Sequence, residues 1–361
     1  MRHLSPDIGV YAQRIVVFFQ DGSWERLGAN EYQPGALFFF LLPGFLTRYG
    51  LGLTQSFILV NAVLIALHIA VLRFAGGRYA AWAALPLFLA AGPISMFRFE
   101  LVVSLVTLLA FVLWRARRSL ASGVLLGLAT GIKIYPLLLL PVLFRHPSKA
   151  FSWRWAATVA AGFVGGVGFL LLAFWLTGGS AEHVEQSVLY HFRKPVSVQS
   201  VLAAGATFAA YAVRADGPKH VNAYGIHGLD LPPVARRVVL LGFLASLVAL
   251  WVVPWNRKRP PGSDGVLRLS AILFSLLVWS TALQPQYFLW PLACIALLVI
   301  VPAPRFWFAV VLGLYVVVLV TEQILYPLNY DAFLDIFSWR GGSRTLFWTF
   351  VSGKVVLLAL T

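Results

Sequence analysis

The chain consists mostly of long apolar runs separated by short polar connectors. A helix of about 17 to 25 mainly apolar residues crosses the hydrocarbon core of a bilayer. On this criterion nine runs are predicted to be spanning helices, over residues 51–72, 79–97, 99–114, 155–177, 236–254, 267–283, 287–302, 305–325 and 345–361. The pattern therefore predicts an all-α, polytopic integral membrane protein.

Two further apolar segments are predicted to enter the membrane without crossing it. Residues 35–46 are too few to span, and an internal Pro-Gly step favours an interfacial or re-entrant helix. Residues 121–144 are long enough, but basic residues flank both ends and Gly131, Lys133 and Pro136 interrupt the middle. We interpret this segment as a re-entrant hairpin sheltered by protein, with one simple crossing as the alternative.

The distribution of charge predicts the topology. With the hairpin interpretation, 13 Lys and Arg side chains share one side of the membrane with Asp264 as their only acid, and the other 12 acids fall on the opposite side. The basic residues lie in the connectors 73–78, 115–154 and 256–268 and at Arg305. Cytoplasmic connectors are rich in Lys and Arg. Segments 1–34 and 178–235 are therefore expected to face outward, the second as a long functional loop.

Composition narrows the possible classes of function. The chain is 60% hydrophobic and 11% charged, with a net charge of +15 spread over short connectors. This pattern is typical of membrane topology, and we expect no nucleic-acid partner. One cysteine, Cys294, excludes a disulfide within the chain and a cysteine-based metal cluster. No metal site or cofactor is expected from the spacing of His, Asp and Glu, and a divalent cation stays an open alternative.

Segment 1–34 carries the densest acidic chemistry. Asp7, Asp21, Glu25 and Glu31 lie here among aromatic residues. A carboxylate in hydrocarbon would be neutral or very costly, whereas one at the water interface stays ionised. We therefore expect 1–34 to be an outer catalytic loop.

Seven short motifs occur along nearly the whole chain. They are D-I-G-V-Y at 7–11, E-Y-Q-P at 31–34, R-F-E at 98–100, G-I-K-I-Y-P at 131–136, Y-H-F-R-K-P-V-S-V-Q-S at 190–200, Q-P-Q-Y-F-L-W at 284–290 and Y-P-L-N-Y-D at 326–331. In this order the chain resembles glycosyltransferase family 87, the polyprenyl-phosphate-sugar-dependent transferases of the GT-C fold. The resemblance implies one GT-C-like membrane domain over 1–361. It also implies inverting transfer of mannose or arabinose from a polyprenyl-phosphate donor to a glycan or glycolipid hydroxyl on the extracytoplasmic side of the cell membrane.

The family resemblance assigns the general base to Asp7. A sugar hydroxyl is a weak nucleophile, and a positioned carboxylate accepts its proton as the new bond forms. The residues alone leave an alternative, because Ser-Pro-Asp is a good signal for a helix that starts near Ile8, which Asp7 would cap. Asp21 or Glu31 could also share or replace the role of base.

The polar motif at residues 190–200 is expected to bind the phosphate of the donor. The leaving group of the reaction is a lipid phosphate, so cations are needed where negative charge develops. His191, Arg193 and Lys194 are the candidates, and the resemblance favours a histidine of this loop as the phosphate contact. Solvated surface charge is the alternative interpretation.

The cleft itself is expected to involve four further residues. Glu31 would accept hydrogen bonds from acceptor hydroxyls, and Tyr32 would stack on a sugar ring. Arg98 and Glu100 either line the same cleft or form a structural ion pair. Lys133, a cation within the membrane, either anchors a lipid phosphate or extends its ammonium to the interface.

Related chains carry a transmembrane helix before the catalytic aspartate, and the 361 residues do not include it. We expect it to lie upstream; otherwise the six-residue tail before Asp7 must be translocated unaided. Two other functions stay open: a polytopic lipid or solute transporter or flippase, and a catalytically inactive member of the fold. Transporters commonly have inverted repeats and ionisable residues near the midplane, neither of which is evident here.

Overall fold

A computed structural model describes residues 5–27, 31–147, 151–213, 218–223, 226–252, 262–337 and 343–361, without the side chains of residues 5–7, 191 and 192. The α-helices are α1 (Ser5–Asp21), α2 (Pro34–Leu46), α3 (Leu53–Phe97), α4 (Glu100–Arg115), α5 (Ser119–Ile132), α6 (Leu140–Leu143), α7 (Trp153–Leu176), α8 (Ala181–Arg193), α9 (Val201–Ala212), α10 (Pro233–Val252), α11 (Ser263–Trp279), α12 (Leu292–Leu297), α13 (Arg305–Gln323), α14 (Tyr330–Phe337) and α15 (Arg344–Ala359). The 3-10 segments are η1 (Thr47–Tyr49), η2 (Tyr135–Leu139), η3 (Pro285–Leu289) and η4 (Leu298–Ile300), and a π-type segment, η5, covers Ile324–Leu328. The strands are β1 (Val196–Ser197), β2 (Lys219–Ala223) and β3 (Ile226–Asp230).

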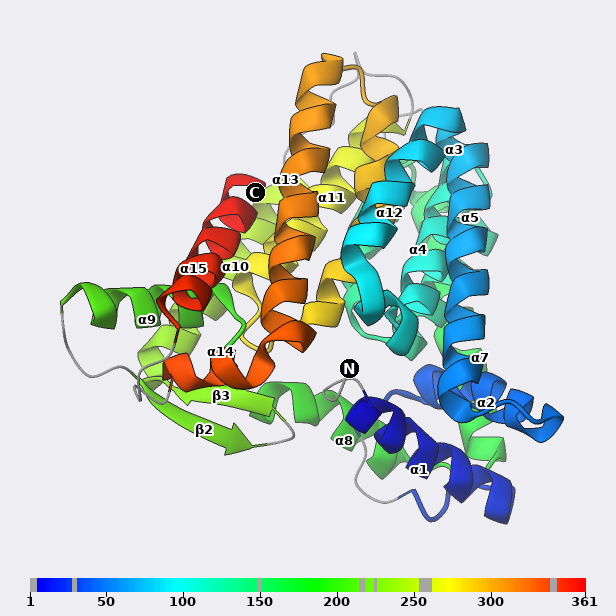
Figure 1. Cartoon of the computed structure of the whole chain (residues 1–361). Coiled ribbons are helices and arrows are strands. Elements are labelled where there is room, and N and C mark those ends of the chain that lie inside the picture. The colour runs from blue at the N-terminus through cyan, green and yellow to red at the C-terminus, as the bar shows by residue number, and fades with distance from the viewer. Residues whose placement is uncertain are drawn as a thin grey trace.

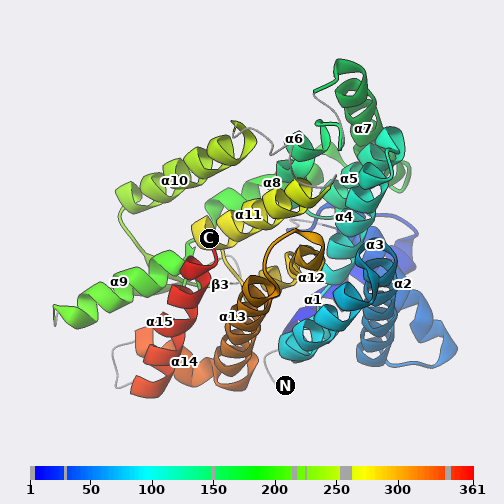
Figure 2. The same cartoon turned by 90° about the horizontal axis from the view of Figure 1, so that it is seen from above.

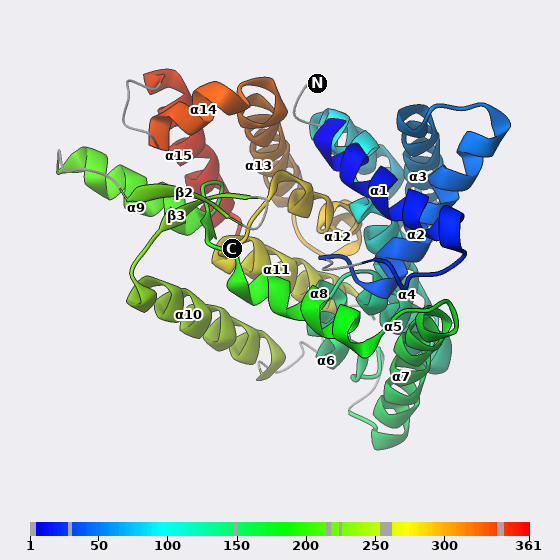
Figure 3. The same cartoon turned by 90° about the horizontal axis from the view of Figure 1, so that it is seen from below.

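The helices form a tall bundle with a layer of shorter elements across one end (Figure 1). The bundle contains α3, α4, α5, α7, α11, α13 and α15, and α10 stands beside α11 (Figure 2). Seen from below, α1, α8, α14 and the small sheet lie across the end of the bundle (Figure 3). The sheet is antiparallel in the order β1-β3-β2. The region between bundle and end layer contains the site described below.

The helical membrane class is confirmed, and the number of nine spanning helices is not. Within the described residues, four segments are long and apolar enough to cross a membrane: α3, α7, α10 and Arg305–Leu328. The 45-residue α3 contains two of the expected spans, 51–72 and 79–97. It bends between them at Gly77, whose φ of 76° lies in the left-handed region that glycine adopts without strain.

The expected span 287–302 is wrong as one continuous helix. It consists of η3, the six-residue α12 and η4, and every residue of α12 is buried. Tyr315 of α13 donates a hydrogen bond of 2.6 Å to the carbonyl of Phe288, which satisfies one backbone acceptor of this irregular stretch. Irregular backbone at membrane depth is tolerated where protein buries it. The apolar composition of the segment thus reflects contact with other helices, not with lipid.

The segment that we interpret as a hairpin reverses direction. Trp114, at the end of α4, donates a 2.7 Å hydrogen bond to the carbonyl of Arg145, and Trp155, at the start of α7, donates one of 2.8 Å to that of Leu143. Residues 143–145 therefore return to the end of the bundle from which α5 starts. Lys133 lies at the tip, immediately after α5. The place of this hairpin relative to a bilayer stays a prediction.

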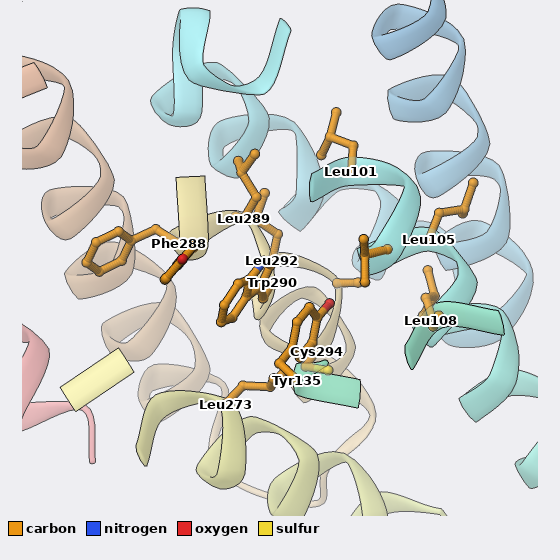
Figure 4. Close-up of a cluster of buried hydrophobic side chains, with 14 of the residues drawn as sticks. Leu101, Leu105, Leu108, Tyr135, Leu273, Phe288, Leu289, Trp290, Leu292 and Cys294 are labelled. Atoms are coloured by element: carbon orange, nitrogen blue, oxygen red, sulfur yellow. The ribbon is translucent and has the colours of Figure 1, made fainter. Parts of the chain in front are cut away.

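The tip of the hairpin is fixed by aromatic packing. Tyr135 stacks on Trp290, with ring centroids 4.2 Å apart and planes inclined by 15°. Figure 4 shows these rings among leucines of α4, Leu273 of α11 and Leu292 of α12. Burial of such large aromatic side chains strongly stabilises a core. The backbone on either side of Lys133 and of η3 is thereby held in place.

Segment 1–34 is not the plain loop that we expected, because Ser5–Asp21 form helix α1. Ile8, Tyr11 and Ile15 recur at helical spacing and are buried. Burying this apolar face against the bundle stabilises the helix, whereas a loop would leave the same residues in water. The long outer segment 178–235 is likewise structured, since it contains α8, α9 and the three strands.

Basic side chains join connectors at the end of the bundle opposite this layer. Arg115 donates a 2.9 Å hydrogen bond to the carbonyl of Ala75, and Arg145 donates one of 3.1 Å to that of Trp251. The first contact links two connectors that the charge pattern assigns to one side of the membrane, and the second links the connector 115–154 to the end of α10, which precedes the connector 256–268. The structure therefore groups these basic connectors away from the acidic segment 1–34.

Candidate active site

A cavity of about 240 Å³ lies between the end layer and the bundle. Its lining comes from α1, the residues just before α2, the start of α4, the hairpin tip, the end of α8, β3 and the start of η3. The lining residues are Val10, Tyr11, Glu31, Tyr32, Gln33, Arg98, Phe99, Glu100, Ile132, Lys133, Tyr190, Lys194, Ile226, Gln284, Gln286 and Tyr287. Five of the predicted site residues are thus brought together: Glu31, Tyr32, Arg98, Glu100 and Lys194.

One wall of the cavity is an ion pair between α4 and the hairpin tip. The ammonium of Lys133 lies 2.6 Å from Oε1 of Glu100, a residue with no exposed surface. The same nitrogen lies 4.9 Å from the ring centroid of Phe99 and 4.6 Å from that of Tyr287. Glu100 is therefore paired with Lys133, a partner that differs from the Arg98 of our ion-pair alternative.

A second ion pair joins the residues before α2 to the end of α8. Nζ of Lys194 lies 3.7 Å from Oε2 of Glu31 and 4.3 Å from the ring centroid of Tyr190. The pKa of Lys194 is lowered to about 8, mainly by burial and to a smaller extent by the nearby charge of Lys133, while Glu31 acts in the opposite direction. Burial and the carboxylate of Glu31 both raise the pKa of Tyr190. Lys194 is thus cationic at neutral pH and loses its charge in mildly alkaline solution.

Arg98 and Tyr32 are held by buried partners. Arg98 donates a 2.8 Å hydrogen bond to the hydroxyl of Tyr326, far away in the sequence. The ring of Tyr32 meets those of Phe40 and Phe99 edge to face, at centroid distances of 5.1 and 5.9 Å. Both side chains are therefore fixed before any ligand binds, which lowers the entropic cost of binding.

An apolar groove of about 460 Å³ adjoins the polar cavity. It lies between the hairpin tip, α10 and α11, and is lined by Lys133, Ile134, Tyr135, Leu137, Leu138, Lys194, Arg236, Val239, Leu240, Phe243, Leu276, Trp279, Ser280, Thr281, Ala282, Tyr287 and Trp290. Lys133, Lys194 and Tyr287 line both spaces. The polar cavity and the apolar groove therefore meet at two cations.

Three predicted site residues are placed differently. Asp7 lies on α1, one helical turn before the cavity-lining Tyr11, and its side chain is outside the described residues. His191 lies on α8 between Tyr190 and Lys194, and its side chain is also outside them. Arg193 is exposed, bonds Gln186 at 3.3 Å and does not line the cavity.

Sequence reasoning missed three glutamines and left the role of Lys133 open. Gln33, Gln284 and Gln286 line the cavity, and among the described residues the carboxamide oxygens of Gln33 and Gln286 have no hydrogen-bond partner. The motif Q-P-Q was visible as an outward-facing stretch, and only the fold shows which cavity it enters. Within the described residues, no group of three or more His, Cys, Asp or Glu side chains could hold a metal ion.

Fold and site together define a helical membrane protein with a cavity suited to an amphiphilic ligand. The model of glycosyltransferase family 87 matches residues 31–280, which is more than half of the chain. The chain therefore belongs to glycosyltransferase family 87, as its motifs predict, and is a membrane glycosyltransferase. The match includes the cavity residues from Glu31 to Lys194 and does not extend to Asp7 or to the Q-P-Q motif. No curated protein is similar enough to this chain to count as a relative.

Proposed function

We propose that this glycosyltransferase takes a sugar, mannose or arabinose, from a polyprenyl-phosphate donor and adds it to a hydroxyl of a glycan or glycolipid. One observation carries the proposal: the polar cavity and the apolar groove meet at Lys133 and Lys194. A polyprenyl-phosphate sugar has the same three parts in the same order. Its isoprenoid chain suits the groove, its phosphate suits the cations, and its sugar suits the polar cavity.

The reaction is proposed as an inverting displacement at the anomeric carbon. The acceptor oxygen forms a bond to that carbon, and the bond from the carbon to the phosphate oxygen breaks. The acceptor proton moves to the carboxylate of Asp7, and the bonding electrons leave with the phosphate. The phosphate thereby changes from a monoanionic diester to a dianionic monoester, so cations next to it stabilise the transition state.

The position of Asp7 supports its role as the base. It lies four residues before Tyr11 on α1, and residues four apart in a helix lie one above the other on one face. Tyr11 lines the cavity, so the backbone of Asp7 belongs to the cavity side of α1. Glu31 is less suited, because its carboxylate is already engaged in an ion pair with Lys194 at 3.7 Å.

Lys194 is the best placed of the three proposed phosphate-binding residues. Its side chain is buried and lines both the cavity and the groove. His191 lies in the last turn of α8, three residues before Lys194, at a position that suits a second phosphate contact. Arg193 is exposed, bonds Gln186 and does not line the cavity, so its contribution would require a change of rotamer or of helix end.

The active site is proposed to face the extracytoplasmic side of the cell membrane. The basic connectors that contain Arg115 and Arg145 lie at the end of the bundle opposite the cavity. Cytoplasmic connectors are rich in such residues. Donor and membrane lipids would reach the groove laterally, between α10 and α11.

Transfer of labelled sugar tests the proposal. Membranes containing the protein are assayed with polyprenyl-phosphate-mannose and with polyprenyl-phosphate-arabinose. We expect transfer from one donor and a loss of about 10²-fold or more in Asp7→Asn, because that variant lacks the base.

The matched control is Asp21→Asn, at the far end of the same helix, where Asp21 contacts Arg26 at 3.4 Å. It should keep the wild-type rate. Transfer that persists in Asp7→Asn would remove Asp7 as the base. An absence of transfer from both donors would contradict the donor class, and would favour transport or an inactive member of the family.

A further inference from the structure

Lys133 lies where three parts of the fold converge. It follows α5 directly, in an extended conformation with φ −155° and ψ 141°. Its ammonium contacts Glu100 and Phe99 at the start of α4, and Tyr287 and Trp290 in and after η3. Because hairpin tip, α4 and η3 all hold this one nitrogen, its position is defined before any ligand arrives.

The contacts of Lys133 leave part of its hydrogen-bonding capacity unused. An ammonium has three N–H donors. Within the described residues, Glu100 provides its one hydrogen-bond acceptor, at 2.6 Å, and the remaining contacts are faces of aromatic rings. The side chain is 12% exposed, and that surface lines both the polar cavity and the apolar groove. Two donors are therefore available to an anion at the junction.

A second buried Lys–Glu pair shows what a purely structural arrangement looks like in the same chain. Lys354 of α15 contacts Glu322 of α13 and lies 5.1 and 5.6 Å from the rings of Phe288 and Phe350. Its side chain is 3% exposed, and it lines neither the cavity nor the groove. The chemistry of the two pairs is the same, and only that of Lys133 opens onto a space for ligand.

We infer that Lys133 binds the phosphate of the isoprenoid donor at the mouth of the groove, and that Glu100 is a positioning residue that fixes the ammonium there. This inference rests on the proposed function, since it names the residue pair that the donor phosphate meets. A cation surrounded by rings is poorly hydrated, so its attraction to a phosphate is stronger than in water. Arginine and lysine bonds to phosphate are charge-assisted and are the stronger class of hydrogen bond.

The test measures binding of farnesyl phosphate and of farnesol to the purified full chain in detergent. Both probes carry the isoprenoid part, and one carries the phosphate. We expect the wild type to bind farnesyl phosphate more tightly than farnesol. In Lys133→Met the affinity for farnesyl phosphate should fall about tenfold or more, and the affinity for farnesol should not change. Lys133→Arg keeps the charge and should keep the preference for the phosphate.

The matched control is Lys354→Met, which breaks the other buried pair and should preserve the preference. Removing one partner of a buried ion pair leaves an uncompensated charge that destabilises the fold. If either single variant does not fold, two double variants are compared. One combines Lys133→Met with Glu100→Gln, and the other combines Lys354→Met with Glu322→Gln. Each double variant removes both charges of one buried pair. A phosphate preference that survives the loss of Lys133, or falls equally in both doubles, would overturn the inference.

The role of Glu100 has its own readout. Glu100→Gln removes the counter-charge and keeps the size of the side chain, so farnesyl phosphate should bind at least as well as in the wild type. Turnover of sugar should fall about tenfold, because the ammonium is no longer held in line with the leaving oxygen. Equal loss of binding and turnover would instead indicate a purely structural role for Glu100.

The outcomes separate this inference from the proposed function. Farnesyl phosphate binding that requires Lys133, in a protein that transfers no sugar, would retain the phosphate site and overturn the transferase donor proposal. Sugar transfer from a polyprenyl-phosphate donor without any requirement for Lys133 would retain the donor proposal and overturn the phosphate site at Lys133.

Discussion

At the scale of single residues, the cavity consists of charges that already have partners. Lys133 has Glu100 at 2.6 Å, and Lys194 has Glu31 at 3.7 Å. Leaving either cation buried without a partner would cost several kcal/mol, so the carboxylates stabilise the empty site. In the shorter pair the side chain of Glu100 is completely buried, whereas in the longer pair that of Glu31 is 28% exposed. The two pairs therefore differ in how far solvent reaches their carboxylates.

The pKa of Lys194 predicts how activity depends on pH. Burial lowers this pKa to about 8, so the cation is present at neutral pH and is lost as the pH rises through that value. Because the cation is the form that attracts phosphate, kcat/KM for the donor should fall above about pH 8. Lys194→Arg carries a charge that does not titrate in this range, and its profile should stay flat.

Steady-state rates from pH 6 to 10 in both proteins check this prediction. An alkaline decrease that is the same in wild type and Lys194→Arg would assign the titration to another group. Lys219→Arg, an exposed lysine on β2, is the control and should keep the decrease.

Membership of the cavity was predictable from residue type and order for several residues, and their partners were not. The sequence indicates that Glu31, Arg98, Glu100 and Lys194 belong to one site, and the cavity brings them together. Glu100 and Lys133 are 33 positions apart, and nothing in their spacing shows that a hairpin tip brings them within 2.6 Å. From the sequence alone, a glutamate that is held in an ion pair cannot be distinguished from one that is available to bind a sugar.

At the scale of elements, the hairpin is positioned by close packing of α5 on α7. Gly123 and Gly127 of α5 face Gly162 and Gly166 of α7, and a Cβ at any of them would lie 2.1 to 2.3 Å from a backbone oxygen of the facing helix. Four-residue spacing of small residues lets membrane helices approach this closely. Because α5 leads directly to Lys133, this contact also sets the position of the junction cation.

Gly127→Ala tests this packing. The added Cβ would meet the carbonyl oxygen of Phe163 at 2.2 Å, so the helices must move apart, and we expect a loss of about 1–3 kcal/mol in stability. Thermal unfolding in detergent measures it. Gly165→Ala is the control on α7, where the added methyl group meets nothing within 4 Å. Equal melting temperatures for both variants would contradict the close contact.

Hydropathy predicted most of the long helices. It failed where a segment is apolar because other helices surround it, since a segment surrounded by lipid has the same composition. Segment 287–302 is apolar because α12 is enclosed by its neighbours, and its helix is only six residues long. Segment 1–34 was expected as a loop because charges dominate it, yet Tyr11 stacks on Phe40 at 4.5 Å and anchors a helix. Apolar content alone does not identify which surface an element meets.

At the scale of the whole molecule, the two ends of the bundle differ in chemistry. The end with the cavity carries paired charges, aromatic rings and the small sheet, and the other end carries connectors rich in arginine (Figure 1). The charge pattern of the sequence predicts this division, because the two faces of a membrane select different residues. Which end faces the cytoplasm follows from the same rule and stays a prediction.

Labelling of single cysteines tests that orientation in intact cells. Lys219→Cys on β2 and Arg73→Cys in α3 both replace exposed side chains, and they lie at opposite ends of the bundle. A membrane-impermeant maleimide should label Lys219→Cys in intact cells and Arg73→Cys only after permeabilisation, because the basic end is expected inside. The native Cys294 is 7% exposed, so the wild type should stay unlabelled in both conditions. The opposite result would place the cavity in the cytoplasm, where the transfer reaction would need a donor sugar that faces inward.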